Sequence, residues 1–202
     1  MWKKTVIVIG FGMVLGSLWA GAWFVRHGFS AKDEPSVLEL KLARYLRHLA
    51  VPRQQREAKN PIPATPEILT EAREHFADHC AVCHGNDGSG KTDIGQGVYP
   101  KAPDLRQEET QLLSDGELFY IIHNGIRFTA MPGWGTGRPE DDRDSWKLVR
   151  FIRHLPVITE QELEEMKRFN PVSQRERERQ EEEDRFLRGE PIPLHPEAGH
   201  MH

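Results

Sequence analysis

Residues 80–84 read Cys80-Ala81-Val82-Cys83-His84, and this Cys-x-x-Cys-His motif decides how the rest of the chain is interpreted. Two cysteines at this spacing near a helix end can each form a thioether to one vinyl group of the same porphyrin. The histidine that follows then lies under the porphyrin iron, as its proximal ligand. The motif therefore predicts one covalent haem c, with its iron bound by His84.

Three other roles for the two cysteines were considered. A thioredoxin-like redox pair needs the pattern of a parallel β-sheet, which the sequence lacks. A structural zinc site needs two more ligands at matching spacing, and there is no second cysteine pair. A disulfide across two intervening residues closes a loop so short that it adds little stability.

The haem iron needs a sixth ligand or an open position, and methionine at that position raises the reduction potential. Met131 lies in a loop stiffened by Pro132 and flanked by glycines, within residues 125–134. It is the only methionine inside the predicted haem domain. The others lie at the start of the chain, in an apolar segment, on a charged helix and in the tail (Met1, Met13, Met166 and Met201). The rival ligand is His123, at a helix end.

Three helices are predicted around the motif. The first spans residues 66–81, with Thr65 as a candidate N-cap. The second spans residues 114–123 and stops at Asn124-Gly125, a pair typical of helix C-termini. The third spans residues 143–154 and stops before Pro156. Residues 85–110 are rich in Gly, Pro and Asp and are predicted to be loop.

The N-terminal segment predicts a membrane anchor. Residues 5–25 carry no charge, and a helix of that length spans about 30 Å, enough to cross a bilayer core. Lys3 and Lys4 favour a cytoplasmic N-terminus, with the haem domain on the periplasmic side of the inner membrane. Ala20-Gly21-Ala22 also fits a signal-peptide cleavage site, but h-regions usually run about 7–15 residues. The length favours a retained anchor.

The segments flanking the haem domain are charged. Residues 33–65 hold six Lys/Arg against four Asp/Glu and begin with a predicted amphipathic helix, followed by a Pro-rich linker. This helix could lie on anionic lipid headgroups or pack on its own domain. Beyond Pro156, a short helix is expected over residues 159–169. A charged helical or disordered arm follows, and the end contains His195, His200, Met201 and His202, which could bind copper.

Composition excludes several classes of protein. Charged residues make up 29% of the chain and hydrophobic residues 38%, which excludes a multi-span membrane protein. The formal net charge of −4 argues against a general nucleic-acid binder. Two cysteines are too few for a disulfide-rich secreted scaffold. The predicted organisation is therefore an anchor with its flanks (1–32), a helix and linker (33–65), the haem domain (66–156) and the C-terminal arm (157–202).

Residues 66–156 resemble a class I, mitochondrial-type, monohaem cytochrome c. Ala72, Phe76 and the Cys-x-x-Cys-His motif match the N-terminal helix of that family, which usually has glycine where Ala72 stands. Met131-Pro132 matches its axial methionine segment. Trp146 and Phe151 match aromatic positions of its C-terminal helix, which crosses the N-terminal helix in this fold.

The resemblance implies a small all-α cytochrome c fold behind an N-terminal transmembrane helix. It also implies that the Pro103 carbonyl, in Pro103-Asp104-Leu105, hydrogen-bonds the second nitrogen of the proximal histidine. The implied site is then Cys80 and Cys83 on the porphyrin, with His84 and Met131 on the iron. The basic helix and the charged arm lie outside the resemblance.

The expected function is one-electron transfer by a membrane-anchored periplasmic cytochrome, without catalytic residues, because both axial positions are filled. Its partners would be redox proteins docking over the haem edge, and the fifteen Asp/Glu against ten Lys/Arg of residues 66–156 argue against a large lysine docking ring. An alternative is the haem c subunit of a larger respiratory oxidase or dehydrogenase. A gas sensor or enzyme would follow if Met131 were absent from the iron.

Overall fold

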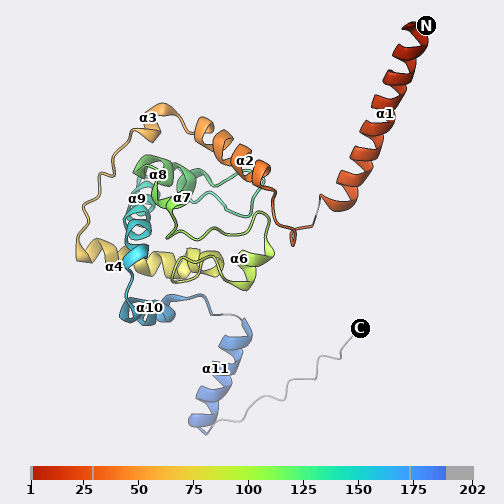
Figure 1. The fold of residues 1–202 in the computed structure, drawn as a ribbon. Helices are drawn as coiled ribbons and strands as arrows, with labels where there is room; N and C mark the ends of the chain where they lie inside the picture. The colour runs from red at the N-terminus through yellow and green to blue at the C-terminus, as the bar shows by residue number, and fades with distance from the viewer. Residues whose placement is uncertain (1, 29, 173, 190–202) are drawn as a thin grey trace.

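The computed structural model describes residues 2–28, 30–172 and 174–189, and every regular element in these ranges is a helix (Figure 1). This confirms the predicted all-α class. Helix α1 (Trp2–His27) extends away from the other helices, with exposed apolar side chains. Its residues Lys4–Arg26 are long and apolar enough to cross a membrane. The described part of the chain holds no second candidate span.

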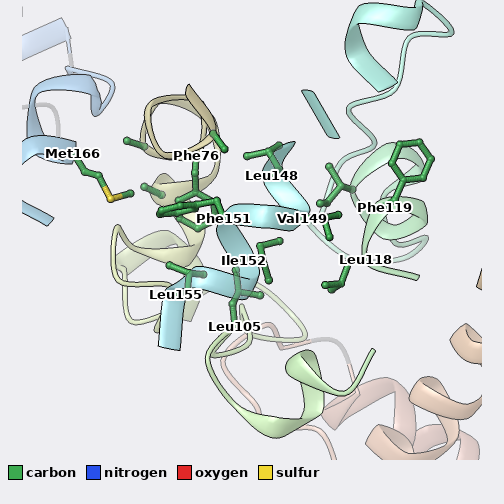
Figure 2. Packing of buried hydrophobic residues seen from close by; sticks show 14 residues of the cluster. Phe76, Leu105, Leu118, Phe119, Leu148, Val149, Phe151, Ile152, Leu155 and Met166 are labelled. Atoms are coloured by element: carbon green, nitrogen blue, oxygen red, sulfur yellow. The ribbon is translucent and has the colours of Figure 1, made fainter. Parts of the chain in front are cut away.

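The core forms where α4 (Pro66–His75) packs against α9 (Pro139–His154). The hydroxyl of Thr65 accepts a hydrogen bond from the Ile68 amide and caps α4, as expected. Phe76 and Phe151 meet at this crossing, with ring centroids 5.0 Å apart and planes tilted by 55° (Figure 2). Ala72, 1% exposed, shows that an alanine is small enough for this contact. The implied crossing of the first and last helices of the domain is confirmed.

Helix α9 begins four residues before the predicted start at Arg143. Pro139 occupies the first turn, where a proline is tolerated because its missing N–H has no intrahelical partner. The same turn contains three acidic residues, Glu140, Asp141 and Asp142. Their negative charges stabilise the positive end of the helix dipole. The helix ends at His154 as predicted and continues into a 3₁₀ turn, η2 (Leu155–Val157).

Helix α8 (Asp115–Asn124) matches the prediction within one residue at each end. Ser114 and Glu117 form a capping box, in which each side chain accepts a hydrogen bond from the other residue's amide. Gly125 ends the helix with φ at 69°, a conformation that costs glycine little.

Residues 85–110 differ from the predicted loop because they contain two short helices, α6 (Asp93–Gly97) and α7 (Glu108–Gln111). Elements of four or five residues are too short to show helical periodicity in a sequence. The predicted first helix is also interrupted. Residues Phe76–Cys80 form a π-helical turn, η1, before α5 (Ala81–His84), and the Ala81 amide bonds the Phe76 carbonyl.

Residues 157–169 pack on the haem domain. The expected helix over residues 159–169 is present as α10 (Glu160–Met166) and a 3₁₀ turn, η3 (Lys167–Phe169). Arg73 of α4 forms ion pairs with Glu162 and Glu165 of α10. Met166 is 0% exposed and belongs to the same core cluster as Phe76 (Figure 2). The charged arm contains α11 (Gln174–Leu187).

Residues 33–65 also contact the domain. They contain α2 (Val37–Ala50) and the short α3 (Arg53–Arg56). Val51 is buried, and the side chain of Asn60 donates a hydrogen bond to the Trp146 carbonyl of α9. Gly116 of α8 lies so close to the Gln55 carbonyl that a Cβ there would clash with it. This part of the chain is therefore held against α8 and α9.

Candidate functional site

A cavity of about 400 Å³ lies among the helices of the haem domain. Its walls come from the Cys-x-x-Cys-His turn, residues 98–105, α8, the loop after α8, α9 and α2. Most of the lining side chains are apolar, among them Phe76, Leu105, Leu118, Ile122, Leu148 and Ile152. The five predicted site residues all line this one cavity: Cys80, Cys83, His84, Pro103 and Met131.

The Cys-x-x-Cys-His turn is held in place by the segment that follows it. The Thr92 hydroxyl lies within donating distance of the Val82 and Cys83 carbonyls, at 2.9 and 3.0 Å. The amide of Gly90 donates to the His84 carbonyl at 2.7 Å. A Cβ at Gly95 would lie 2.1 Å from the Cys83 carbonyl oxygen, so α6 packs directly on the turn.

The two cysteines do not form a disulfide. Burial, with a smaller contribution from the neighbouring Cys83, raises the pKa of Cys80 to about 12. A thioredoxin-like redox pair works in the opposite way, because it needs a thiol whose pKa is lowered. Within the residues that the structure describes, no three His, Cys, Asp or Glu side chains gather as a metal site. The surroundings therefore favour neither a redox pair nor structural zinc.

His84 is half-buried, and its Nδ1 atom is buried without a hydrogen-bond partner. Burial lowers the pKa of His84, while the Pro103 backbone acts in the opposite direction. The lowered pKa favours the neutral imidazole, which is the form that binds metals. The Pro103 backbone lies close enough to His84 to raise its pKa, and its role in orienting this ligand stays a prediction. Asp104 anchors this segment, because the Arg106 guanidinium donates to both of its carboxylate oxygens, each at 2.8 Å.

Met131 lies in a loop that is tied back onto α8. The Ile126 amide donates to the Met131 carbonyl at 3.1 Å, and the Met131 amide donates to the Thr129 hydroxyl at 3.1 Å. The amide of Trp134 donates to the Ile122 carbonyl at 3.0 Å, which closes the loop. These bonds present one thioether at a defined place on the cavity wall.

His123 does not line the cavity. Its ring stacks on Phe119 and lies against Gly135, and its Nδ1 is 3.1 Å from a carboxylate oxygen of Asp142. The rival to Met131 therefore lies outside the cavity that holds the other site residues. The tail residues His195, His200, Met201 and His202 lie outside the described residues, so the copper hypothesis stays a prediction.

Sequence reasoning missed three polar residues of the cavity wall: His79, Arg47 and Lys101. His79 precedes Cys80, and its ring meets Trp134 edge-on at 5.3 Å. Arg47 comes from α2 and Lys101 from the loop before Pro103. Burial and the nearby Arg44 lower the pKa of Arg47, whereas Glu117 raises it, but an arginine stays cationic. Helical spacing alone cannot show that a residue more than thirty positions before the motif reaches the site.

These residues fit a haem c. Two thiols and an imidazole lie on one wall, the buried Nδ1 of the imidazole has Pro103 nearby, and a thioether lies on the same cavity. The apolar lining suits a porphyrin, and Arg47 and Lys101 supply positive charge that would complement its carboxylates.

Comparison with known proteins agrees with this assignment. A family model described as cytochrome c oxidase, cbb3-type, subunit III, matches residues 67–152. The "Cbb3-type cytochrome c oxidase subunit CcoP" of Cereibacter sphaeroides is 33% identical over 75 residues, which are 37% of this chain. The match covers only 24% of that subunit's length. The matched region is a cytochrome c domain, of a type that binds haem and transports electrons.

Proposed function

We propose that this protein is a membrane-anchored c-type cytochrome that transfers single electrons through one haem c. Cys80 and Cys83 bind the haem covalently, and His84 and Met131 are its axial ligands. The observation that carries the proposal is the shared cavity: both thiols, the imidazole and the thioether line it, and His123 does not. When bound, the haem supplies a one-electron ferric/ferrous couple.

The protein's own residues position the ligands and exclude water. The Pro103 carbonyl holds His84 in one orientation and one tautomer. The bonded loop around Met131 would supply a soft, neutral sulfur ligand, which would favour ferrous iron and a high potential. With both axial positions filled, no substrate binds to the iron, and no acid, base or nucleophile is needed.

The anchor places this site at a membrane. Helix α1 spans the inner membrane, and Lys3 and Lys4 keep its N-terminus on the cytoplasmic side. The haem domain then lies on the periplasmic side, where c-type haem is attached. Redox partners dock over the haem edge, and no nucleic acid is involved.

A second candidate is that the chain is the haem c subunit of a larger respiratory oxidase. The comparisons favour it, because both name subunits of a cbb3-type oxidase. Under this proposal α1 and the charged arm contact other subunits. Purification in mild detergent separates the two: a stoichiometric partner that co-purifies supports the subunit, and an active cytochrome purified alone supports the carrier.

The central test is a visible spectrum of the purified protein in both oxidation states, with a variant in which Cys80 and Cys83 are both replaced by alanine. We expect a low-spin haem c spectrum, with haem that stays on the polypeptide after denaturation and acid–acetone extraction. The double variant should carry no covalent haem. Haem that survived extraction in that variant would show that attachment occurs elsewhere.

A further inference from the structure

Helix α2 turns its apolar side chains away from the protein. Five of them form a stripe along the helix, with exposed fractions between 53% and 77%: Leu38, Leu42, Tyr45, Leu46 and Leu49. Successive residues of an α-helix are rotated by about 100°, so these five positions fall within one arc of roughly 100°. We call this surface the α2 stripe.

The opposite side of α2 contacts the domain. Leu40 and Arg47 are half-buried, and Val51 at the end of the helix is 2% exposed. On the helical wheel these three positions cluster on the side opposite the α2 stripe. His48 lies near this side, and its Nδ1 is 2.7 Å from a carboxylate oxygen of Glu117, whose side chain is 9% exposed.

Further polar contacts hold the same orientation. Arg44 pairs with Glu109 of α7 at 3.7 Å, and the hydroxyl of Tyr99 donates to Glu39. Beside Leu40 and Val51, helix α2 therefore attaches through charged and polar groups, and it exposes the apolar residues of the α2 stripe, the reverse of a surface helix in water. A contiguous exposed apolar surface of this kind marks an interaction site.

The position of α2 in the chain indicates what covers the stripe. Helix α1 ends at His27 and α2 begins at Val37, so nine residues join them. Nine residues reach at most about 30 Å, which keeps α2 near the membrane that α1 crosses. Tyr45 on the stripe has the amphipathic ring that is enriched at membrane interfaces, and the exposed Lys41 lies at its edge, where an ammonium can reach the headgroups.

We propose that α2 lies in the membrane interface, with the α2 stripe at the boundary between headgroups and acyl chains. The proposal rests on α1 being the membrane anchor of the proposed function. Because Arg44 and His48 are paired with the domain, the contact is mainly apolar, whereas the sequence had suggested a basic surface on anionic headgroups. Since Arg47 of the same helix lines the haem cavity, α2 also holds that cavity beside the bilayer.

The test uses the full-length holoprotein in vesicles of phosphatidylethanolamine and phosphatidylglycerol. The photoreactive residue benzoylphenylalanine replaces Leu46 in one variant and Leu42 in another. Val157 is the matched control, because it is an apolar residue of η2 that is 68% exposed but lies outside α2. Illumination followed by mass spectrometry detects lipid attached to the protein.

We expect lipid adducts at positions 46 and 42 and no lipid adduct at position 157. The adducts should persist in high salt and in phosphatidylcholine vesicles, because the contact is apolar. Absence of lipid adducts at both positions, in protein that floats with the vesicles, overturns the proposal. In native membranes, the photoreactive residue at position 46 could instead attach to another protein. That result overturns the proposal in favour of a subunit interface.

Failure of the anchor itself gives a different result. Protein that does not float with the vesicles refutes α1 as an anchor, and this proposal with it. The haem spectrum of the same sample reports separately on the electron-transfer site.

Discussion

At the scale of single residues, two methionines show how surroundings decide a role. Met131 lines the cavity from a hydrogen-bonded loop, whereas Met166 is 0% exposed in the core cluster with Phe76. The side chains are chemically identical, but only Met131 lines the cavity that we propose holds the haem. Sequence reasoning placed Met166 beyond the domain, because its helix is highly charged.

The two methionines therefore predict opposite effects. In Met131→Ala the haem should stay attached, while the ferric charge-transfer band at the red end of the spectrum disappears, the potential falls and carbon monoxide binds. Met166→Ala should leave the spectrum unchanged and lower the free energy of unfolding by about 2–5 kcal/mol, because it leaves a cavity in the core. Spectroscopy, redox titration and urea unfolding measure these effects. An unchanged spectrum and potential in Met131→Ala would contradict the ligand assignment.

A second prediction at the scale of residues concerns the stability of the protein at low pH. Arg106 lowers the pKa of Asp104 from 3.8 to about 2, mainly through its side-chain hydrogen bonds. A lowered pKa in the folded state contributes stability above pH 3.8, and that stability is lost as pH falls towards 2. Over this pH range the free energy of unfolding of the wild-type protein should fall by about 1–2 kcal/mol more than that of Asp104→Asn. Urea unfolding at several pH values compares the two, and parallel curves would contradict the prediction.

At the scale of elements, residues 90–97, after the haem motif, support the backbone of the Cys-x-x-Cys-His turn. We call this segment the brace. Thr92, Gly90 and α6 all contact the backbone of residues 82–84. Because Gly95 of α6 has no Cβ, the helix can approach the Cys83 carbonyl. The brace therefore depends on one short helix that the sequence did not predict.

Two glycines of α6 test the brace. A Cβ at Gly95 would lie 2.1 Å from the Cys83 carbonyl oxygen, whereas a Cβ at Gly97 would meet nothing within 4 Å. Gly95→Ala should therefore destabilise the protein by about 1–3 kcal/mol and reduce the yield of attached haem. Gly97→Ala should change neither by more than about 0.5 kcal/mol. Thermal unfolding and haem content measure these effects. Equal stability and haem content in the two variants would contradict the supporting role of α6.

At the scale of the whole molecule, segments outside residues 67–152 complete the site and place it. Helix α2 contributes Arg47 to the cavity, and α10 docks on α4 through Arg73. Under the proposed function, helix α1 ties this assembly to a membrane. Electron transfer would therefore occur within a short distance of the bilayer surface.

The prediction at the scale of the whole molecule concerns membrane attachment through α1. Membranes washed with carbonate or high salt should retain the protein, because burial of about twenty apolar residues outweighs electrostatic contact. Immunoblotting of the pellet and supernatant measures this. Complete release, together with a mature N-terminus at Trp23, would instead demonstrate cleavage after Ala22.

The sequence alone determined the features that depend on short-range chemistry. The Cys-x-x-Cys-His motif, the capped helices and the apolar run of α1 each lie within one contiguous stretch, so neighbouring residues suffice to predict them. Met131 and Pro103 line the cavity, and their roles as ligand and orienting group stay predictions.

Only the tertiary structure decided which surfaces meet. It brought Arg47 to the cavity, packed Met166 into the core and turned the apolar side of α2 outward. Helical spacing defines the two sides of α2, but not which side contacts the domain. That choice depends on partners such as Glu117, sixty-nine positions from His48, and such long-range pairs leave no periodic signal in the sequence.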